Sequence, residues 1–212
     1  MGKGDKIELI SLPGRGRAEA IRLMLIYAGH QFIDSRLTIQ QWHLRRKNDG
    51  FNDDTKLPVM KINDKKTIIG CLDICRFIAL NYGIYGSSSS DQEKIDEVIR
   101  DLEELNQKLA PVIRATLTKN YEARKEAWNV FKEESLFPKL QKYEETLSKE
   151  MFIIGEQYSW ADIALIELLT RFQQCYDSFY LAHFENLRNY CSRFEILPNV
   201  RPYIQSRPES FF

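Results

Sequence analysis

The residues best suited to chemistry in this chain are three cations within its first sixty residues, Arg17, Arg46 and Lys56. A helix is expected to start after Gly70, and the start of a helix presents unpaired amide N–H groups to an anion. Guanidinium and ammonium groups form charge-assisted hydrogen bonds with carboxylates. Together these groups predict a site for a small ligand that carries more than one charge.

The sulfur and imidazole side chains indicate no second kind of chemistry. The four cysteines are Cys71, Cys75, Cys175 and Cys191. They are too sparse for a disulfide scaffold and lack zinc-site spacing, so unpaired thiols are expected. The three histidines are scattered without a metal-binding pattern. We therefore expect no metal site.

Length and composition are those of an ordinary globular chain. Its 212 residues are enough for one large domain or two small ones. Lys+Arg and Asp+Glu both number 30, so there is no basic excess of the kind that nucleic acid requires. No apolar run reaches the roughly 18 residues of a membrane span, and the start has no apolar stretch of signal-peptide type. We expect a cytoplasmic protein without nucleic-acid or membrane partners.

The elements that must position the three cations alternate between strand and helix. Residues 6–12 are apolar on both faces, which predicts a strand that is covered on both sides. Residues 17–27 have helical spacing, and residues 31–37 form a second strand, parallel to the first. A hairpin over 59–69 and a helix over 74–82 follow. This order is typical of a thioredoxin-like domain, and Pro58, directly before a strand, is expected to be cis.

The pattern changes after residue 83. We predict a linker over 84–90, followed by helices only. Ser90 and Glu93 indicate a capping box, and Ser159 and Asp162 indicate another, before an apolar helix of the kind that lies at the centre of a bundle. The predicted fold class is therefore α/β plus all-α, with a thioredoxin-like domain over 1–83 and a helical bundle domain over 91–212.

Five short motifs occur in order along the chain: P-G-R-G-R-A-E-A-I-R at 13–22, Trp42 in the loop after the second strand, K-L-P-V at 56–59, S-W-A-D at 159–162 and R-P-E at 207–209. In this order they resemble cytosolic glutathione transferases of the Sigma-like group, which includes prostaglandin D synthases and helminth enzymes. The resemblance implies a cytoplasmic homodimeric detoxification enzyme. Its co-substrate would be glutathione, and its second substrate a small hydrophobic electrophile.

The resemblance also implies where glutathione binds. Arg17 matches an arginine near the base of the site, and Trp42 matches a tryptophan beside the glycyl end. Arg46 stands where many relatives have lysine, and it would pair with the glycine carboxylate, in two hydrogen bonds if the geometry allows. In relatives an acidic residue near Glu104 reaches the glutathione of the partner subunit. Glu104, or Asp101, is the candidate here, although a solvated or dimer-facing patch is the alternative.

The other end of glutathione falls on five further residues. Lys56 and Leu57 match the loop beside the cysteinyl backbone, and Pro58 fixes that loop. Gly70 and Cys71 stand where relatives carry Gln-Ser against the γ-glutamyl end. Two side-chain donors are lost, each worth about 0.5–1.5 kcal/mol, which predicts roughly ten- to hundredfold weaker binding.

The catalytic position departs from the family pattern. In the resembling enzymes a tyrosine at the end of the first strand donates a hydrogen bond to the glutathione sulfur, because the thiolate is the nucleophile. The matching residue is Ser11, whose hydroxyl lies much closer to the backbone. Serine-using classes place their serine after the L-P-G turn, where this chain has Arg15. Ser11 is the candidate catalytic donor, and a plain strand-end serine is the alternative.

Two functional interpretations follow. The first is a glutathione transferase with weakened activity and an apolar pocket between Leu12, Ile113 and Phe211-Phe212. The second is a non-catalytic relative, either a carrier of hydrophobic ligands or a crystallin-like structural protein. Asp73 has no assigned role, because it would repel a bound carboxylate but attract an ammonium group. Cys71 is either an inert thiol or a redox site. The sequence does not identify the electrophile.

Overall fold

The computed structural model describes residues 4–210, whose contacts divide the chain into two compact units. The first unit comprises the described residues up to Tyr85 together with the segment 197–210. The second comprises Gly86–Ile196. The C-terminal segment thus groups with the sheet-containing unit rather than with the helices that precede it.

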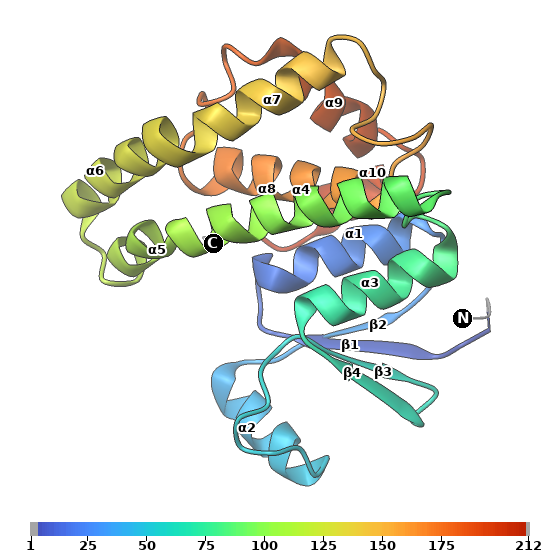
Figure 1. Ribbon diagram of the computed structural model, residues 1–212. Helices are drawn as coiled ribbons and strands as arrows, with labels where there is room; N and C mark the ends of the chain where they lie inside the picture. Colours follow the sequence, from blue (N-terminus) through green and yellow to red (C-terminus); the bar gives the residue numbers. More distant parts are fainter. Residues whose placement is uncertain (1–3, 211–212) are drawn as a thin grey trace. The chain divides into compact units, whose positions relative to one another are not determined.

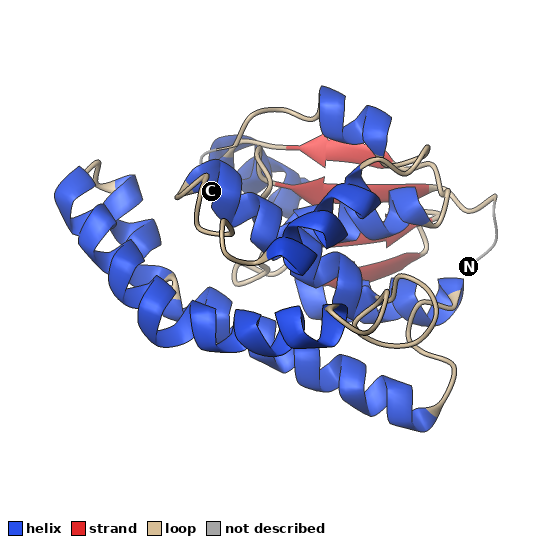
Figure 2. Ribbon diagram, turned by 90° about the horizontal axis from the view of Figure 1, so that it is seen from above, coloured by secondary structure: helices blue, strands red, loops and turns tan. Residues whose placement is uncertain are grey.

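A four-stranded mixed sheet forms the first unit, with the strand order β2-β1-β3-β4. Its strands are β1 (Ile7–Ser11), β2 (Ile33–Arg36), β3 (Val59–Ile62) and β4 (Lys66–Ile69). β1 runs parallel to β2 and antiparallel to β3, which is antiparallel to β4. Figure 2 shows the four strands side by side. Leu9 and Ile10 point to opposite faces of β1 and are both fully buried, which confirms that this strand is covered on both sides.

Helices cover both faces of this sheet. The helices of this unit are the short 3-10 helix η1 (Gly16–Ala18), α1 (Glu19–Tyr27), α2 (Ile39–Asn48), α3 (Cys71–Tyr82) and, from the C-terminal segment, α10 (Arg201–Ser206). α1 packs beside α3 on one face, and α2 lies on the other (Figure 1). Thr38 and Gln41 form a capping box at the start of α2, and basic residues in its last turn complement the helix dipole.

The second unit consists of helices. They are α4 (Ser89–Lys108), α5 (Ala110–Leu117), α6 (Tyr121–Phe131), the π-helical turn η2 (Lys132–Leu136), α7 (Phe137–Leu147), α8 (Trp160–Cys175) and α9 (Glu185–Glu195). α8 packs against α4 and α9 and is buried along most of its length. Ser159 and Asp162 form the predicted capping box at its start, so the central helix and its signal are confirmed.

The start of α4 differs from the prediction. Ser88, not Ser90, is the N-cap residue, and it forms a capping box with Asp91 instead of Glu93. The Asp91 carboxylate also accepts hydrogen bonds from the hydroxyl and the backbone N–H of Ser87. Ser88, Ser89 and Ser90 are each followed three residues later by an acceptor, namely Asp91, Gln92 or Glu93, so the sequence pattern offers three similar caps.

Pro138 does not break the helical path. A proline inside an α-helix removes one hydrogen bond and clashes with the carbonyl four residues earlier. Here it lies in the first turn of α7, directly after the wider π-helical turn η2. Figure 1 shows α6 and α7 continuing one another through this turn. The insertion of a π turn therefore allows the helical path to continue past the proline.

Candidate functional site

Three strand ends bring Ser11, Pro58 and Gly70 to the same edge of the sheet. β1 ends at Ser11, β3 begins directly after Pro58, and β4 ends directly before Gly70. Because β3 is antiparallel to both β1 and β4, its start lies beside the ends of these two strands. Residues from three distant parts of the sequence therefore meet at this edge.

The start of α3 lies at this edge, directly after β4. The Leu57-Pro58 peptide bond is cis, as predicted, and the Pro58 carbonyl accepts the Gly70 N–H at 2.9 Å. Gly70 is the N-cap residue of α3, with φ +95° and ψ 143°, a conformation that strains any residue with a Cβ. As a glycine, Gly70 provides no side-chain cap. The first turn of a helix carries backbone N–H groups that no carbonyl of the same helix accepts, and groups of this kind bind carboxylates.

Trp42 lies in a helix, α2, and not in the loop that the sequence predicts. Its side chain is buried against Ile10 and Val59, with Leu57 packed on the same cluster. The centroid of its ring is 5.9 Å from that of Phe51. The indole thus supports the loop that carries the cis proline, because both pack on one apolar cluster.

The three candidate cations differ in their exposure and in their partners. Arg17 lies in η1, which begins five positions after the end of β1, and its side chain is exposed. Arg46, near the end of α2, has its guanidinium 2.9 Å from the carboxylate of Asp53, which is fully exposed. Lys56 is exposed and forms no hydrogen bond or ion pair with any residue in the described part of the chain. Because the Asp53 side chain is fully in solvent, its ion pair with Arg46 is weak, which leaves this cation able to exchange partners.

Ser11 faces inward. Its side chain is buried, and its hydroxyl donates to the Leu12 carbonyl at 3.1 Å and accepts from the Arg22 guanidinium at 2.6 Å. Arg22 also donates to Glu19 and Asp34, at 2.9 and 3.0 Å. In this arrangement the serine proton points to the backbone and not to a ligand.

Sequence patterns did not predict the cluster of charged residues around Arg22, the residue that donates a hydrogen bond to Ser11. Glu19 accepts hydrogen bonds from Tyr203 at 2.8 Å and Arg207 at 3.2 Å, both in the C-terminal segment. Burial alone would raise the pKa of Glu19, but Arg15, Arg22 and Arg207 hold it below its ordinary value. One signal was available: an acidic and a basic residue three positions apart within a helix whose other residues are mostly apolar.

Glu104 belongs to the second unit. It lies on α4, half-exposed, with its carboxylate 2.6 Å from Lys108 and 3.1 Å from Lys139. Hydrogen bonds from these two lysines lower its pKa. Asp101 pairs with Lys139 as well, at 2.7 Å. The contact of Glu104 or Asp101 with a partner subunit stays a prediction.

The predicted apolar pocket also stays a prediction. Leu12 lies in the first unit and Ile113 in the second, while Phe211 and Phe212 lie outside the described residues. Over residues 4–210, no helix is both long and apolar enough to cross a membrane. In the same range, no three His, Cys, Asp or Glu side chains are grouped as a metal site would need.

A thioredoxin-like unit with a cis proline beside a helix start, followed by an all-helical unit, is the fold of the glutathione transferases. Comparison with known proteins agrees. Residues 106–207 match the family model for the glutathione S-transferase C-terminal domain. The glutathione S-transferase class-mu 28 kDa isozyme of Schistosoma japonicum is 31% identical over 166 residues, which are 76% of this chain and 77% of that protein. The chain belongs to the glutathione S-transferase family.

Solved structures confirm the fold. A monomeric glutathione S-transferase of the hookworm Necator americanus superposes with a TM-score of 0.81 and 22% identity, covering 98% of this chain and all of the other. The prostaglandin synthase D of Nilaparvata lugens gives a TM-score of 0.81 and 21% identity, covering 96% of this chain and all of the other. At this identity the likeness concerns the fold alone.

Proposed function

We propose that this protein is a glutathione transferase that joins glutathione to small hydrophobic electrophiles or uses it to reduce them. In conjugation, the thiolate sulfur forms a bond to an electrophilic carbon, the leaving group departs with its electron pair, and the thiol proton passes to solvent. The observation that carries this proposal is the cis Leu57-Pro58 bond beside the glycine that begins α3, in a chain of this family.

Glutathione has two carboxylates and one ammonium, and the edge of the sheet offers partners for each. The γ-glutamyl carboxylate would accept hydrogen bonds from the first amides of α3, next to Gly70 and Cys71. The main chain of Leu57 would bind the cysteinyl backbone. Arg46 and Lys56, which lie on either side of residues 47–55, would bind the glycine carboxylate.

Asp73 would bind the ammonium group of the γ-glutamyl end. It is exposed in the first turn of α3, and its carboxylate oxygen lies 3.8 Å from where a side chain on Gly70 would begin. The Gln-Ser pair of the relatives is absent here. With the Asp73 carboxylate beside the γ-glutamyl carboxylate, two negative charges would lie close together, and they require a compensating cation. The ammonium of glutathione supplies one.

Activation of the glutathione thiol is the step that we expect to be slow in the proposed reaction. Ser11 remains our candidate donor, but its proton now goes to the Leu12 carbonyl, so it would have to rotate toward the sulfur. Arg17 and the main chain near Ser11 and Leu57 would supply the remaining electrostatic stabilisation of the thiolate. We therefore expect slow conjugation.

The hydrogen bonding of Ser11 favours a second candidate function. A serine whose hydroxyl is engaged with Arg22 and Leu12 suits a non-catalytic relative that keeps the fold, either a carrier of hydrophobic ligands or a crystallin-like protein. Retention of Arg17, Lys56 and the cis proline supports the enzyme instead.

The finer assignments are proposals as well. Five motifs support the Sigma-like group, although the isozyme of Schistosoma japonicum is named a class-mu protein. A cytoplasmic location and a role in detoxification follow the family resemblance. We propose a homodimer in which Glu104 faces the glutathione of the other copy, and the hookworm relative shows that a monomer is the alternative.

Calorimetric titration of the full chain with reduced glutathione tests the proposal. We expect binding with a dissociation constant between micromolar and low millimolar, weakened about tenfold in Arg46→Ala by the loss of one charge-assisted bond. Arg188→Ala, on an exposed part of α9, is the matched control and should leave binding unchanged.

Activity with a generic aromatic electrophile then separates the two candidate functions. A large gain in Ser11→Tyr would show that Ser11 limits the chemistry, and circular dichroism would show whether this buried substitution folds. Absence of any binding heat up to about 10 mM glutathione, a very weak limit, would overturn the transferase proposal in favour of the carrier or structural role.

A further inference from the structure

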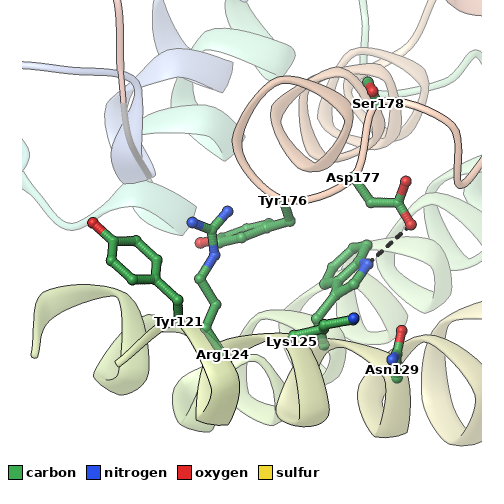
Figure 3. Close-up of a pocket in the computed structure, with 8 residues that line it drawn as sticks. Tyr121, Arg124, Lys125, Asn129, Tyr176, Asp177 and Ser178 are labelled. Carbon is green, nitrogen blue, oxygen red and sulfur yellow. Dashed lines mark hydrogen bonds between the residues drawn. The ribbon is translucent and has the colours of Figure 1, made fainter. Parts of the chain in front are cut away.

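A hollow in the helical unit, lined by none of the residues proposed to bind glutathione, opens between α6 and the chain that follows α8 (Figure 3). Its volume is about 420 Å³, within the range of about 300–1,000 Å³ that is usual for small-molecule sites. The residues that line it come from Tyr121 to Asn129 and from Tyr176 to Ser178. All belong to the second unit.

Aromatic rings form one wall of this hollow. The rings of Trp128 and Tyr176 are stacked, with centroids 5.3 Å apart and an interplanar angle of 28°. The Arg124 guanidinium lies 5.6 Å from the centroid of the Tyr176 ring. Figure 3 shows Tyr121, Arg124 and Tyr176 gathered at one end. A planar ring system could extend this stack, because aromatic and guanidinium faces both pack on flat π surfaces.

Hydrogen-bond donors at this end are unused. Arg124 donates one of its five N–H groups to the Cys175 carbonyl. Lys125 is exposed and forms no hydrogen bond or ion pair within residues 4–210. The Tyr176 hydroxyl is buried and has no hydrogen-bond partner in that same range. Buried hydroxyls are nearly always paired, so this one indicates that a partner is missing.

The acidic residue of the wall does not oppose an anion at this end. Asp177 accepts hydrogen bonds from Trp128 at 3.2 Å and from the Phe179 backbone at 3.0 Å, and Lys132 lies 3.6 Å away. Burial would raise the pKa of Asp177, but these three contacts hold it below its ordinary value. Figure 3 places Asp177 at the end of the hollow opposite Tyr121. The unsatisfied positive charge is at the Arg124 end.

We propose that this hollow binds planar aromatic carboxylates independently of glutathione. The ring system lies against Tyr176 and Trp128. The carboxylate accepts hydrogen bonds from Arg124 and from the Tyr176 hydroxyl, and Lys125 adds a second positive charge. The site predicts discrimination against neutral analogues, since Arg124 and Lys125 place two positive charges at the end where the carboxylate binds.

The test is calorimetric titration of the full chain with 2-naphthoate, with and without reduced glutathione. We expect binding that glutathione does not change and that 2-naphthamide does not reproduce. Arg124→Met, which keeps the stem and removes the charge, should weaken binding by tenfold or more, the effect of a bond to a charged group. Tyr176→Phe should weaken it about threefold or more. Arg188→Met is the matched control.

Two results would overturn the proposal: no binding of 2-naphthoate at millimolar concentration, or equal binding by wild type, Arg124→Met and Tyr176→Phe. Arg124→Met also loses the bond to Cys175, so its folding must be checked by circular dichroism. Tyr176→Phe removes only an unpartnered hydroxyl and should unfold at the same or a higher temperature than wild type. Its affinity therefore decides the question even if Arg124→Met does not fold.

Discussion

Glu19 in the first unit and Asp162 in the second are both fully buried carboxylates, yet their pKa values move in opposite directions. Burial favours a higher pKa for both carboxylates. Around Glu19 three arginines outweigh it, so the pKa falls. Around Asp162 the partners are Ser159, Tyr190 and the backbone of Ile153 and Ser159, all neutral donors, so burial prevails and the pKa rises.

The two carboxylates also connect different parts of the chain. Glu19 accepts hydrogen bonds from Tyr203 and Arg207, which lie more than 180 positions further along the chain. It therefore holds the C-terminal segment to α1. Asp162 closes a capping box with Ser159, three positions before it, and within residues 4–210 it also accepts hydrogen bonds from Ile153 and Tyr190. Charge pairing stabilises a long-range junction, whereas neutral hydrogen bonds stabilise a local turn.

Removing the first carboxylate should have the largest effect. Glu19→Ala leaves the guanidinium groups of Arg22 and Arg207 buried with fewer partners, which should lower the free energy of unfolding by about 3–5 kcal/mol. Urea unfolding of the full chain measures this. Glu93→Ala, at an exposed position of α4, is the control and should stay within about 0.5 kcal/mol of wild type. An equally small loss in Glu19→Ala would remove the charged network as a source of stability.

The second carboxylate should tolerate neutralisation better. In Asp162→Asn one of the two side-chain oxygens becomes an NH₂ group that faces hydrogen-bond donors. The cost of those unpaired donors is partly offset because a buried charge disappears. We expect a loss of about 2 kcal/mol in the free energy of unfolding, less than for Glu19→Ala. If Asp162→Asn is the less stable of the two, neutral donors are worth more here than charge pairing.

The same contrast explains what could be predicted from the sequence. The capping box at Ser159 and Asp162, the cis Pro58 and the apolar faces of β1 are local patterns, and each was confirmed. The start of α4 was misplaced by two residues, because the run of serines offers several similar caps.

Long-range partnerships were out of reach of sequence patterns. Nothing local to Ser11 indicates that its hydroxyl meets Arg22, and Trp128 and Tyr176 are separated by almost fifty positions before they stack. Such contacts depend on packing between elements, which spacing along the chain does not encode. The candidate glutathione site could be named only where a strand end, a proline or a helix start marks it.

The tyrosine hydroxyls that donate to the two carboxylates give a more selective test of the comparison between Glu19 and Asp162. Tyr190 donates to Asp162 and Tyr203 donates to Glu19. Tyr190→Phe should cost about 1.5–3 kcal/mol in the free energy of unfolding, because it removes a donor to a buried anion that has no cation. Tyr203→Phe should cost only about 0.5–1.5 kcal/mol, since arginines still surround Glu19. Thermal or urea unfolding measures both, and equal losses would contradict the distinction.

The pH dependence of stability should separate the two carboxylates with the smallest effect. The folded pKa of Glu19 is lowered, so its stabilisation is complete above the unfolded value of about 4.3 and is lost as the pH falls through the folded pKa. The folded pKa of Asp162 is raised, so lowering the pH through it, toward the unfolded value of about 3.9, adds stability.

Unfolding by urea from about pH 7 to about pH 3, with Glu19→Gln and Asp162→Asn as references, measures these slopes, which cannot exceed about 1.4 kcal/mol per pH unit for one proton. Relative to Asp162→Asn, wild type should gain stability as the pH falls through the raised pKa. Relative to Glu19→Gln, it should lose stability below about pH 4.3. Two slopes of the same sign would mean that neutral donors hold Asp162 ionised as firmly as the arginines hold Glu19.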